Sequence, residues 1–199
     1  SGMIVMAIPH TAAWLLAMSL ASLPATAGQF SEEPVQVDTG SGFLHGTLTR
    51  PADAGKAVPA VLIISGSGPT DRDGNVLGIP GRNDSLKLLA HALAEERIAS
   101  IRYDKRGIAA SRASGRPEEQ MRIDDYAADA CAWLASMQQA GLGPLALIGH
   151  SEGSLIGMLA AQRCPQHVSA YVSLAGVGGR AADVLRQQMQ NPQVSEQTR

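Results

Sequence analysis

The sequence lacks an excess of charge of either sign. Lys and Arg number 16 against 18 Asp and Glu, so the formal net charge is -2 and the sequence pI lies near 6.2. Proteins that hold a nucleic-acid backbone need a basic face that displaces counterions from the phosphates. The charge balance therefore argues against nucleic acid as a partner.

Cysteine is almost absent, and nowhere do Cys and His residues stand at metal-ligand spacing. We therefore predict neither a metal nor another cofactor. Cys131 and Cys164 both fall in segments with a helical pattern, where a free cysteine often packs as a small apolar side chain. We predict two free thiols, although export would permit a disulfide.

Basic residues are also missing from Met3 to Thr11, where a secretory leader normally carries them. An apolar run from Ala12 to Leu23 nevertheless precedes the small-residue triplet 25–27. This pattern predicts residues 1–27 to be a cloning remnant (Ser1 and Gly2) plus a signal peptide cleaved after Ala27, and hence export to the periplasm or the medium. A retained membrane anchor and a misassigned start codon are the alternatives.

What is present is a regular alternation of predicted strands and helices, at a length typical of one domain. Partly alternating runs at 34–38 and 43–49 predict a hairpin, and the apolar run 60–64 predicts a strand buried on both faces. The order that follows is typical of an α/β fold with a mostly parallel sheet between two helix layers. The predicted helices are 85–97, 123–140 and 151–164, and the remaining predicted strands are 99–103, 144–149 and 167–175.

A strand meets a helix at Gly149-His150-Ser151-Glu152-Gly153, which has the Gly-x-Ser-x-Gly pattern of a nucleophile elbow. Such a turn strains the serine backbone and leaves no room for side chains at the two flanking glycines. Ser151 is therefore the predicted nucleophile, at the N-terminus of a helix whose dipole favours a developing oxyanion. The alternative is an ordinary Gly- and Ser-rich turn.

Three segments together resemble the α/β-hydrolase family, and in particular bacterial esterase-like members related to serine aminopeptidases and dienelactone hydrolases. They are the segments 65–75 and 103–107 and the elbow, in the family's order and spacing, within a resemblance that covers about Phe43 to Gly178. The resemblance implies a core at 28–178, followed by a cap or linker segment that begins at 179. It also implies an oxyanion hole made by the backbone N–H groups of Ser67 and Glu152.

Neither the acidic loop 71–75 nor Asp104 is expected to bind a metal or to act in catalysis. The loop from Asp71 to Asn75 lacks the glycine and glutamate positions of an EF-hand, so we interpret it as turn chemistry. Asp104 precedes the elbow, whereas the family places the triad acid after the serine, so Asp104 and Arg106 are expected to tie their loop to its neighbours. Relatives often have glycine where this chain has Ala109.

A serine hydrolase also needs a general base, and none of the five histidines suits this role. The resemblance implies that the acid, the histidine and further C-terminal strands would follow Arg199. We therefore expect this chain to be a C-terminally incomplete piece, inactive by itself. Strand 167–175 would then be an apolar sheet edge that aggregates or pairs with a second copy or with the absent part.

The leading hypothesis is hydrolysis of carboxylic esters with small or medium acyl groups through an acyl-enzyme on Ser151. A peptidase or a thioesterase on the same fold is the nearest alternative. A second alternative, from a different class, is a binding protein of this fold that has no catalytic base.

Overall fold

The computed structural model describes residues 29–52, 54–55, 57–176 and 178–179. The predicted leader at 1–27 and nearly all of the predicted cap or linker segment at 179–199 lie outside these residues. The strands are β1 (Phe30–Asp38), β2 (Phe43–Pro51), β3 (Ala60–Ile64), β4 (Ala99–Tyr103), β5 (Leu145–His150) and β6 (Ala170–Leu174). The helices are α1 (Ser85–Glu95), α2 (Ile123–Gln139) and α3 (Glu152–Arg163), with short 3-10 helices η1 (Ala109–Ser114), η2 (Glu118–Gln120) and η3 (Pro165–His167).

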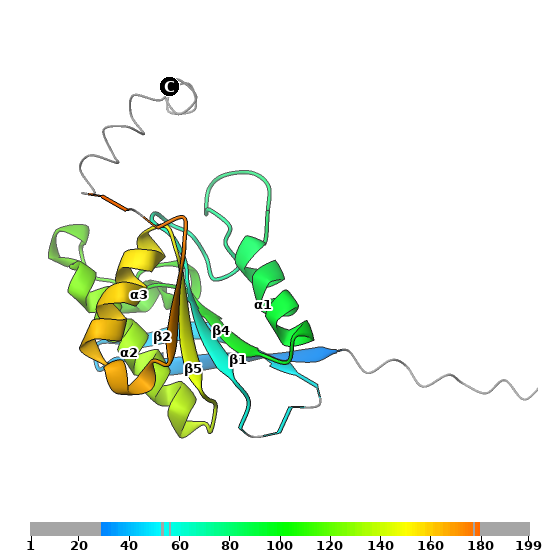
Figure 1. Cartoon of the computed structure of the whole chain (residues 1–199). Coiled ribbons are helices and arrows are strands. Elements are labelled where there is room, and N and C mark those ends of the chain that lie inside the picture. Colours follow the sequence, from blue (N-terminus) through cyan, green and yellow to red (C-terminus); the bar gives the residue numbers. More distant parts are fainter. Residues whose placement is uncertain (1–28, 53, 56, 177, 180–199) are drawn as a thin grey trace, which may run out of the picture.

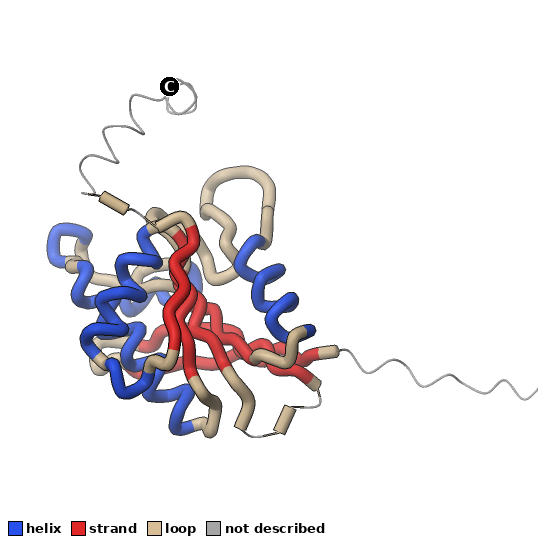
Figure 2. Tube along the Cα trace, viewed as in Figure 1, coloured by secondary structure: helices blue, strands red, loops and turns tan. Residues whose placement is uncertain are grey.

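The strands form one sheet in the order β1-β2-β4-β3-β5-β6. The predicted hairpin is confirmed, since β1 and β2 pair antiparallel around residues 39–42. Strands β4, β3, β5 and β6 run parallel, and β3 is buried along its whole length because it has a neighbour on each side and helices on both faces. The carboxyl ends of β3, β5 and β6 therefore meet at one edge, which lies at the top of Figure 2.

Helix α1 covers one face of the sheet, and α2 and α3 cover the other (Figure 1). Alternate side chains of the buried strands point to opposite faces, so Leu62 and Ile64 join the core under α2 and α3, whereas Ile63 faces α1. The core under α2 and α3 is the larger one, and it contains the Trp133 and Tyr103 rings with their centroids 5.6 Å apart. The three-layer arrangement predicted from the sequence is confirmed.

Strand β6 begins three residues later than predicted. The predicted strand starts at His167, but this residue belongs to the 3-10 helix η3, which begins at Pro165. The first hydrogen bond to β5 comes from Ser169, whose N–H donates to Leu145 O at 2.8 Å. Within the described residues β6 pairs with β5 alone, and its Val172 and Leu174 side chains are 44% and 37% exposed.

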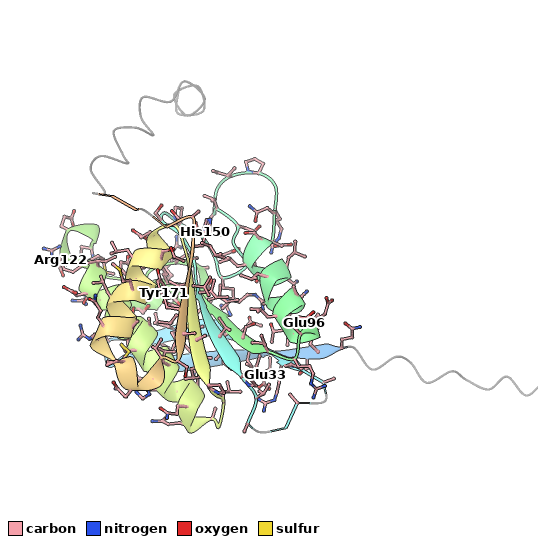
Figure 3. All side chains as sticks on the ribbon, in the orientation of Figure 1. Glu33, Glu96, Arg122, His150 and Tyr171 are labelled. Carbon is pink, nitrogen blue, oxygen red and sulfur yellow. A yellow bond between two sulfur atoms is a disulfide. The ribbon has the colours of Figure 1, made fainter. Side chains whose placement is uncertain are left out.

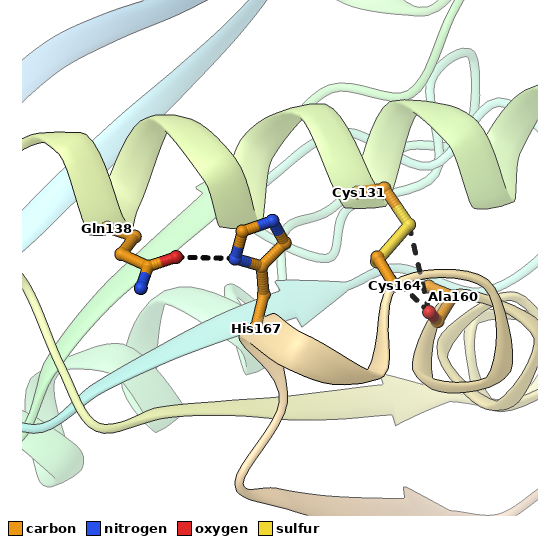
Figure 4. Close-up of a disulfide and its surroundings, with 5 residues drawn as sticks. All are labelled: Cys131, Gln138, Ala160, Cys164 and His167. Atoms are coloured by element: carbon orange, nitrogen blue, oxygen red, sulfur yellow. Dashed lines mark hydrogen bonds between the residues drawn. A yellow bond between two sulfur atoms is a disulfide. The ribbon is translucent and has the colours of Figure 1, made fainter.

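The prediction of two free thiols is wrong, because Cys131 and Cys164 form a disulfide with a Cα–Cα distance of 6.1 Å (Figure 4). Cys131 lies in α2, and Cys164 directly follows Arg163, the last residue of α3. The two helices pack side by side on the same face of the sheet, so residues 33 positions apart in sequence come within bonding distance. Helical patterns locate each cysteine on its own helix but do not reveal which helices are neighbours.

No helix in the described part of the chain is both long enough and apolar enough to cross a bilayer.

Candidate active site at the carboxyl edge of the sheet

The turn between β5 and α3 has the geometry of a nucleophile elbow. Ser151 follows the last residue of β5 and precedes the first residue of α3, with φ 53° and ψ -117°. An L-residue reaches this region only under strain. Two backbone hydrogen bonds of 2.9 Å hold Ser151 in this turn: its N–H donates to Leu174 O, and its carbonyl oxygen accepts the N–H of Ser154.

The two elbow glycines are required by their surroundings. A Cβ on Gly149 would lie 2.6 Å from the Cα of Ser154, and a Cβ on Gly153 would lie 2.7 Å from the carbonyl oxygen of Ser65. Both obstacles are backbone atoms in packed elements, so neither moves at low cost. The sequence pattern therefore has a steric basis here: the helix can turn back over the strand end only where both side chains are absent.

The loop after β3 lies against the elbow. A Cβ built on Gly66 would be 3.4 Å from Ser151 Cβ, which places the Gly66–Ser67 segment next to the serine. Ser67 and Ser151 line one pocket of about 470 Å³, together with Gly66, Thr70, Gly74, Val76, Asn83, Ser85, Leu86 and His150. The three residues predicted from the sequence to form the site, at positions 67, 151 and 152, thus lie together at one edge of the sheet.

Asp104 connects the turn after β4 to the loop after β3. It is 1% exposed and accepts hydrogen bonds from the backbone N–H of Arg72 at 2.7 Å and from the Arg72 guanidinium at 2.6 and 3.1 Å. Ala110 N–H is a further donor, at 3.1 Å. These bonds confirm the predicted tethering role of Asp104.

Arg106 makes a second buried tether. Its guanidinium pairs with Asp129 of α2 and also donates to Ser41 Oγ at 2.6 Å and to Ser114 O at 3.2 Å. Burial raises the pKa of the Asp129 carboxyl, and the hydrogen bond and charge of Arg106 oppose that rise. Arg106 therefore holds α2, the hairpin turn and η1 to the same point. The sequence alone did not identify Asp129, because a single aspartate inside an amphipathic helix has no distinguishing pattern.

The turn that follows is strained at Ala109, which has φ 43°. This is the position where the family resemblance leads us to expect glycine, the residue that adopts such a φ freely. The chain therefore keeps the left-handed turn without the residue best suited to it.

The aspartates and asparagines at 71–84 form a hydrogen-bonded loop. Asp71 Oδ1 accepts the N–H groups of Asp73 and Asn75 at 2.9 Å, and Asn75 Nδ2 donates to Asp84 Oδ1 at 2.7 Å. The bond from Asn75 and the neighbouring guanidinium of Arg82 lower the pKa of Asp84. Among the described residues no group of three or more His, Cys, Asp or Glu side chains is arranged to hold a metal ion. The interpretation of this loop as turn chemistry agrees with these bonds.

The described histidines lie in four separate places. His91 of α1 pairs with Glu32 of β1 at 2.9 Å, and His167 hydrogen-bonds to Gln138 at the end of the sheet opposite the elbow (Figure 4). His45 is in β2, and His150 is exposed beside Ser151 at the top of the sheet (Figure 3). Across the segments that the structure describes, no histidine side chain is hydrogen-bonded to Ser151 Oγ.

Comparison with known proteins places the fold in one family. The family model for the alpha/beta hydrolase fold matches residues 74–193, more than half of the 199-residue chain. The protein belongs to the α/β-hydrolase family. A search of curated proteins found no match.

Solved structures of this fold are similar over most of this chain. The alpha/beta hydrolase GrgF from Penicillium sp. sh18 is 22% identical, with a TM-score of 0.59 over 85% of this chain and 56% of its own. A dienelactone hydrolase from Anabaena variabilis is 23% identical, with a TM-score of 0.57 over 74% of this chain and 64% of its own. A cold-adapted esterase from an Arctic intertidal metagenomic library is 19% identical, with a TM-score of 0.56 over 83% of this chain and 69% of its own. The chain thus spans less than two thirds of the first two structures.

Proposed function

We propose that this protein hydrolyses carboxylic esters through an acyl-enzyme on Ser151. The observation that carries the proposal is the strained backbone of Ser151 at a strand-to-helix turn whose flanking glycines admit no Cβ. Strained backbone conformations of this kind cluster at functional sites, and in a Gly-x-Ser-x-Gly turn the strain exposes the serine hydroxyl as a nucleophile. The esterase and the dienelactone hydrolase among the similar structures support an ester rather than another acyl substrate.

In this mechanism Ser151 Oγ attacks the ester carbonyl and forms a tetrahedral intermediate. A general base takes the Oγ proton, the N–H groups of Ser67 and Glu152 hold the oxyanion, and the C–O bond to the alcohol breaks as the same proton passes to the departing alkoxide. Water, deprotonated by the base, then attacks the acyl-enzyme and releases the carboxylic acid and the Ser151 hydroxyl. The pocket of about 470 Å³ that Ser67 and Ser151 line would take the substrate. Its small and polar walls, with Val76 and Leu86 as the larger apolar residues, favour short acyl groups.

Both half-reactions need a general base, and the described residues place no histidine on Ser151 Oγ. We therefore expect the 199-residue chain by itself to react slowly with a fluorophosphonate probe. Imidazole added to the solution supplies a base from outside and should accelerate the reaction. Peptide mapping is expected to place the adduct on Ser151.

Two variants control this experiment. Ser151→Ala should abolish the adduct, whereas Ser67→Ala should label as the wild type does, since Ser67 lines the same pocket and contributes only its backbone N–H. An adduct that never forms on Ser151, with or without imidazole, would contradict the proposed nucleophile. Fast labelling without imidazole would contradict the expected inactivity. Parallel rates with ester, thioester and aminoacyl-arylamide substrates then separate the three acyl classes.

Export and self-association remain part of the proposal. The disulfide between Cys131 and Cys164 supports export, because such bonds persist in oxidising compartments. Among the described residues no strand pairs with the outer edge of β6, and this edge, with the exposed Val172, supports pairing with another chain. Cell fractionation tests the first point. Light scattering of the wild type against Val172→Lys tests the second, and a monodisperse wild-type monomer would contradict it.

A further inference from the structure

Lys105 is a buried cation in the turn after β4, and it contacts both sides of the candidate oxyanion hole. It is 3% exposed, which is rare for lysine. Its Nζ donates to the carbonyl oxygen of Gly66 at 2.6 Å and to Glu152 Oε2 at 2.8 Å, and lies 5.5 Å from the centre of the Tyr126 ring. One ammonium group therefore joins the loop after β3 to the first residue of α3.

The bond to Gly66 acts on the peptide group that carries one proposed oxyanion donor. The carbonyl of Gly66 and the N–H of Ser67 belong to the same planar peptide, so in the trans form they point in opposite directions. An ammonium fixed on the oxygen holds the N–H in one direction and opposes a flip of the peptide. It also polarises the group, since a hydrogen bond to a carbonyl strengthens the donor at the other end of that peptide.

The bond to Glu152 acts at the second proposed donor. The N–H of Glu152 is one of the first, unpaired N–H groups of α3, and its side chain is held by the same Nζ. A substrate oxygen accepts both N–H groups only if their spacing is fixed before it arrives. Lys105 bonds the Gly66 carbonyl and the Glu152 carboxylate at the same time, so it ties the loop after β3 to the start of α3, the two segments that carry the proposed donors.

We infer that Lys105 is a positioning residue of the oxyanion hole: it orients and polarises the Ser67 N–H through the Gly66 carbonyl, and it holds Glu152, the residue that carries the second donor, through its carboxylate. The inference rests on the proposed function, because it assigns Ser67 N–H and Glu152 N–H to the oxyanion. A purely structural ion pair would affect stability alone. A positioning residue also changes the affinity for a tetrahedral oxyanion and the electronic state of the Ser67 amide.

The first measurement needs no catalysis. The ¹⁵N chemical shift of the Ser67 amide responds to a hydrogen bond on the Gly66 carbonyl, so Lys105→Met should move it in the full chain. Exchange of the charge without loss of length provides the matched pair: Lys105→Cys is alkylated with bromoethylamine, which restores an ammonium, or with 1-iodopropane, which leaves an uncharged chain of the same length without a hydrogen-bond donor. The two native cysteines are held in the disulfide, so without reductant the new thiol alone reacts. The shift should return with the ammonium and not with the propyl group.

The second measurement is equilibrium binding of phenylboronic acid, whose tetrahedral adduct on Ser151 places an oxygen in the oxyanion hole. Loss of one oxyanion donor costs about 100- to 1,000-fold in catalysis, and a misdirected donor should cost less, so we expect Lys105→Met to weaken binding about 10- to 100-fold. The bromoethylamine product should recover most of that loss.

The outcomes separate the two proposals. An unchanged Ser67 shift, or equal boronic acid affinities of the ammonium and propyl products, would overturn the role of Lys105. If the wild type binds no better than Ser151→Ala with imidazole present, the proposed function fails and the positioning role fails with it, even where the Ser67 shift responds to the ammonium.

Discussion

The turn after β4 and the turn after β5 lie at the same edge of the sheet, but different forces hold them in place. The turn after β4 buries three consecutive charged residues, Asp104, Lys105 and Arg106, each paired with a partner from another segment. The elbow after β5 instead depends on two glycines that leave room for backbone. A turn held by charge can be weakened in steps, partner by partner. A turn held by the absence of Cβ atoms tolerates no added atom.

The largest effect is expected at the elbow. In Gly153→Ala the new Cβ would meet the carbonyl oxygens of Ile64 and Ser65, which belong to the central strand and its end and cannot withdraw. We expect a loss of about 4 kcal/mol in the free energy of unfolding, or failure to fold. Urea denaturation followed by circular dichroism measures it.

Gly157→Ala is the matched control in the same helix, because its Cβ would meet the Tyr171 ring at 3.0 Å, a side chain that can shift. It should cost clearly less than Gly153→Ala. Equal losses of stability for the two variants would contradict the conclusion that the elbow depends on the absence of a Cβ at residue 153.

The next largest effect tests the charge-held turn. Asp129→Asn leaves the Arg106 guanidinium buried without a counter-charge, which should cost about 3 kcal/mol. Asp124→Asn, an exposed position of the same helix, is the control and should change stability by under about 0.5 kcal/mol. If thermal and urea unfolding give the same small change for both variants, charge pairing does not hold this turn.

A gain in stability is expected at Ala109, where the charge-held turn is strained. Ala109→Gly relieves a φ of 43° and should stabilise the protein by about 0.5 to 1 kcal/mol. Ala110→Gly, the next residue, has no positive φ to relieve and should destabilise by about the same amount through the entropy of the unfolded chain. Opposite signs in paired urea titrations confirm the strain, and a loss in both variants contradicts it.

The smallest expected effect is a pH dependence of stability at the ion pair between β4 and β1. Arg102 of β4 pairs with Glu32 of β1 at 2.9 Å. Partial burial acts to raise the pKa of Glu32, but the hydrogen bonds from His91 and Arg102 outweigh it and hold the pKa below its ordinary value of 4.5. A lowered carboxyl pKa adds stability above the unfolded value, and that stability is lost as the pH falls through the folded pKa.

The wild type should therefore be more stable than Glu32→Gln at pH 7, and the difference should shrink below about pH 4.5. Thermal unfolding of both proteins between pH 7 and pH 3 measures it. A difference that stays constant over this range would show that ionisation of Glu32 contributes nothing.

Local sequence predicted the elements and the elbow because both depend on near neighbours in the chain. The run of apolar residues at 60–64 and the spacing of Gly149, Ser151 and Gly153 are visible without knowledge of the fold. The family resemblance added Ser67 as a donor position, and the pocket that Ser67 and Ser151 share agrees with it. That agreement concerns position, while the role of each residue remains a prediction.

What the sequence could not predict depends on contacts between distant segments. The Arg106–Asp129 pair, the disulfide and the bond from Lys105 to Gly66 all join elements whose adjacency follows from the order of strands in the sheet. The later start of β6 reflects competition within one segment, where Pro165 favours a helical turn over an extended strand.

The disulfide also makes residues 131–164 a closed covalent ring, and Ser151 lies within it. A protease that cuts one bond inside the ring opens it without releasing a fragment, so the nucleophile stays attached to both halves of the chain. On a gel without reductant such a nicked protein migrates as one band, and only reduction separates the pieces. The bond thus hides a single cut at the elbow on a gel until a thiol is added.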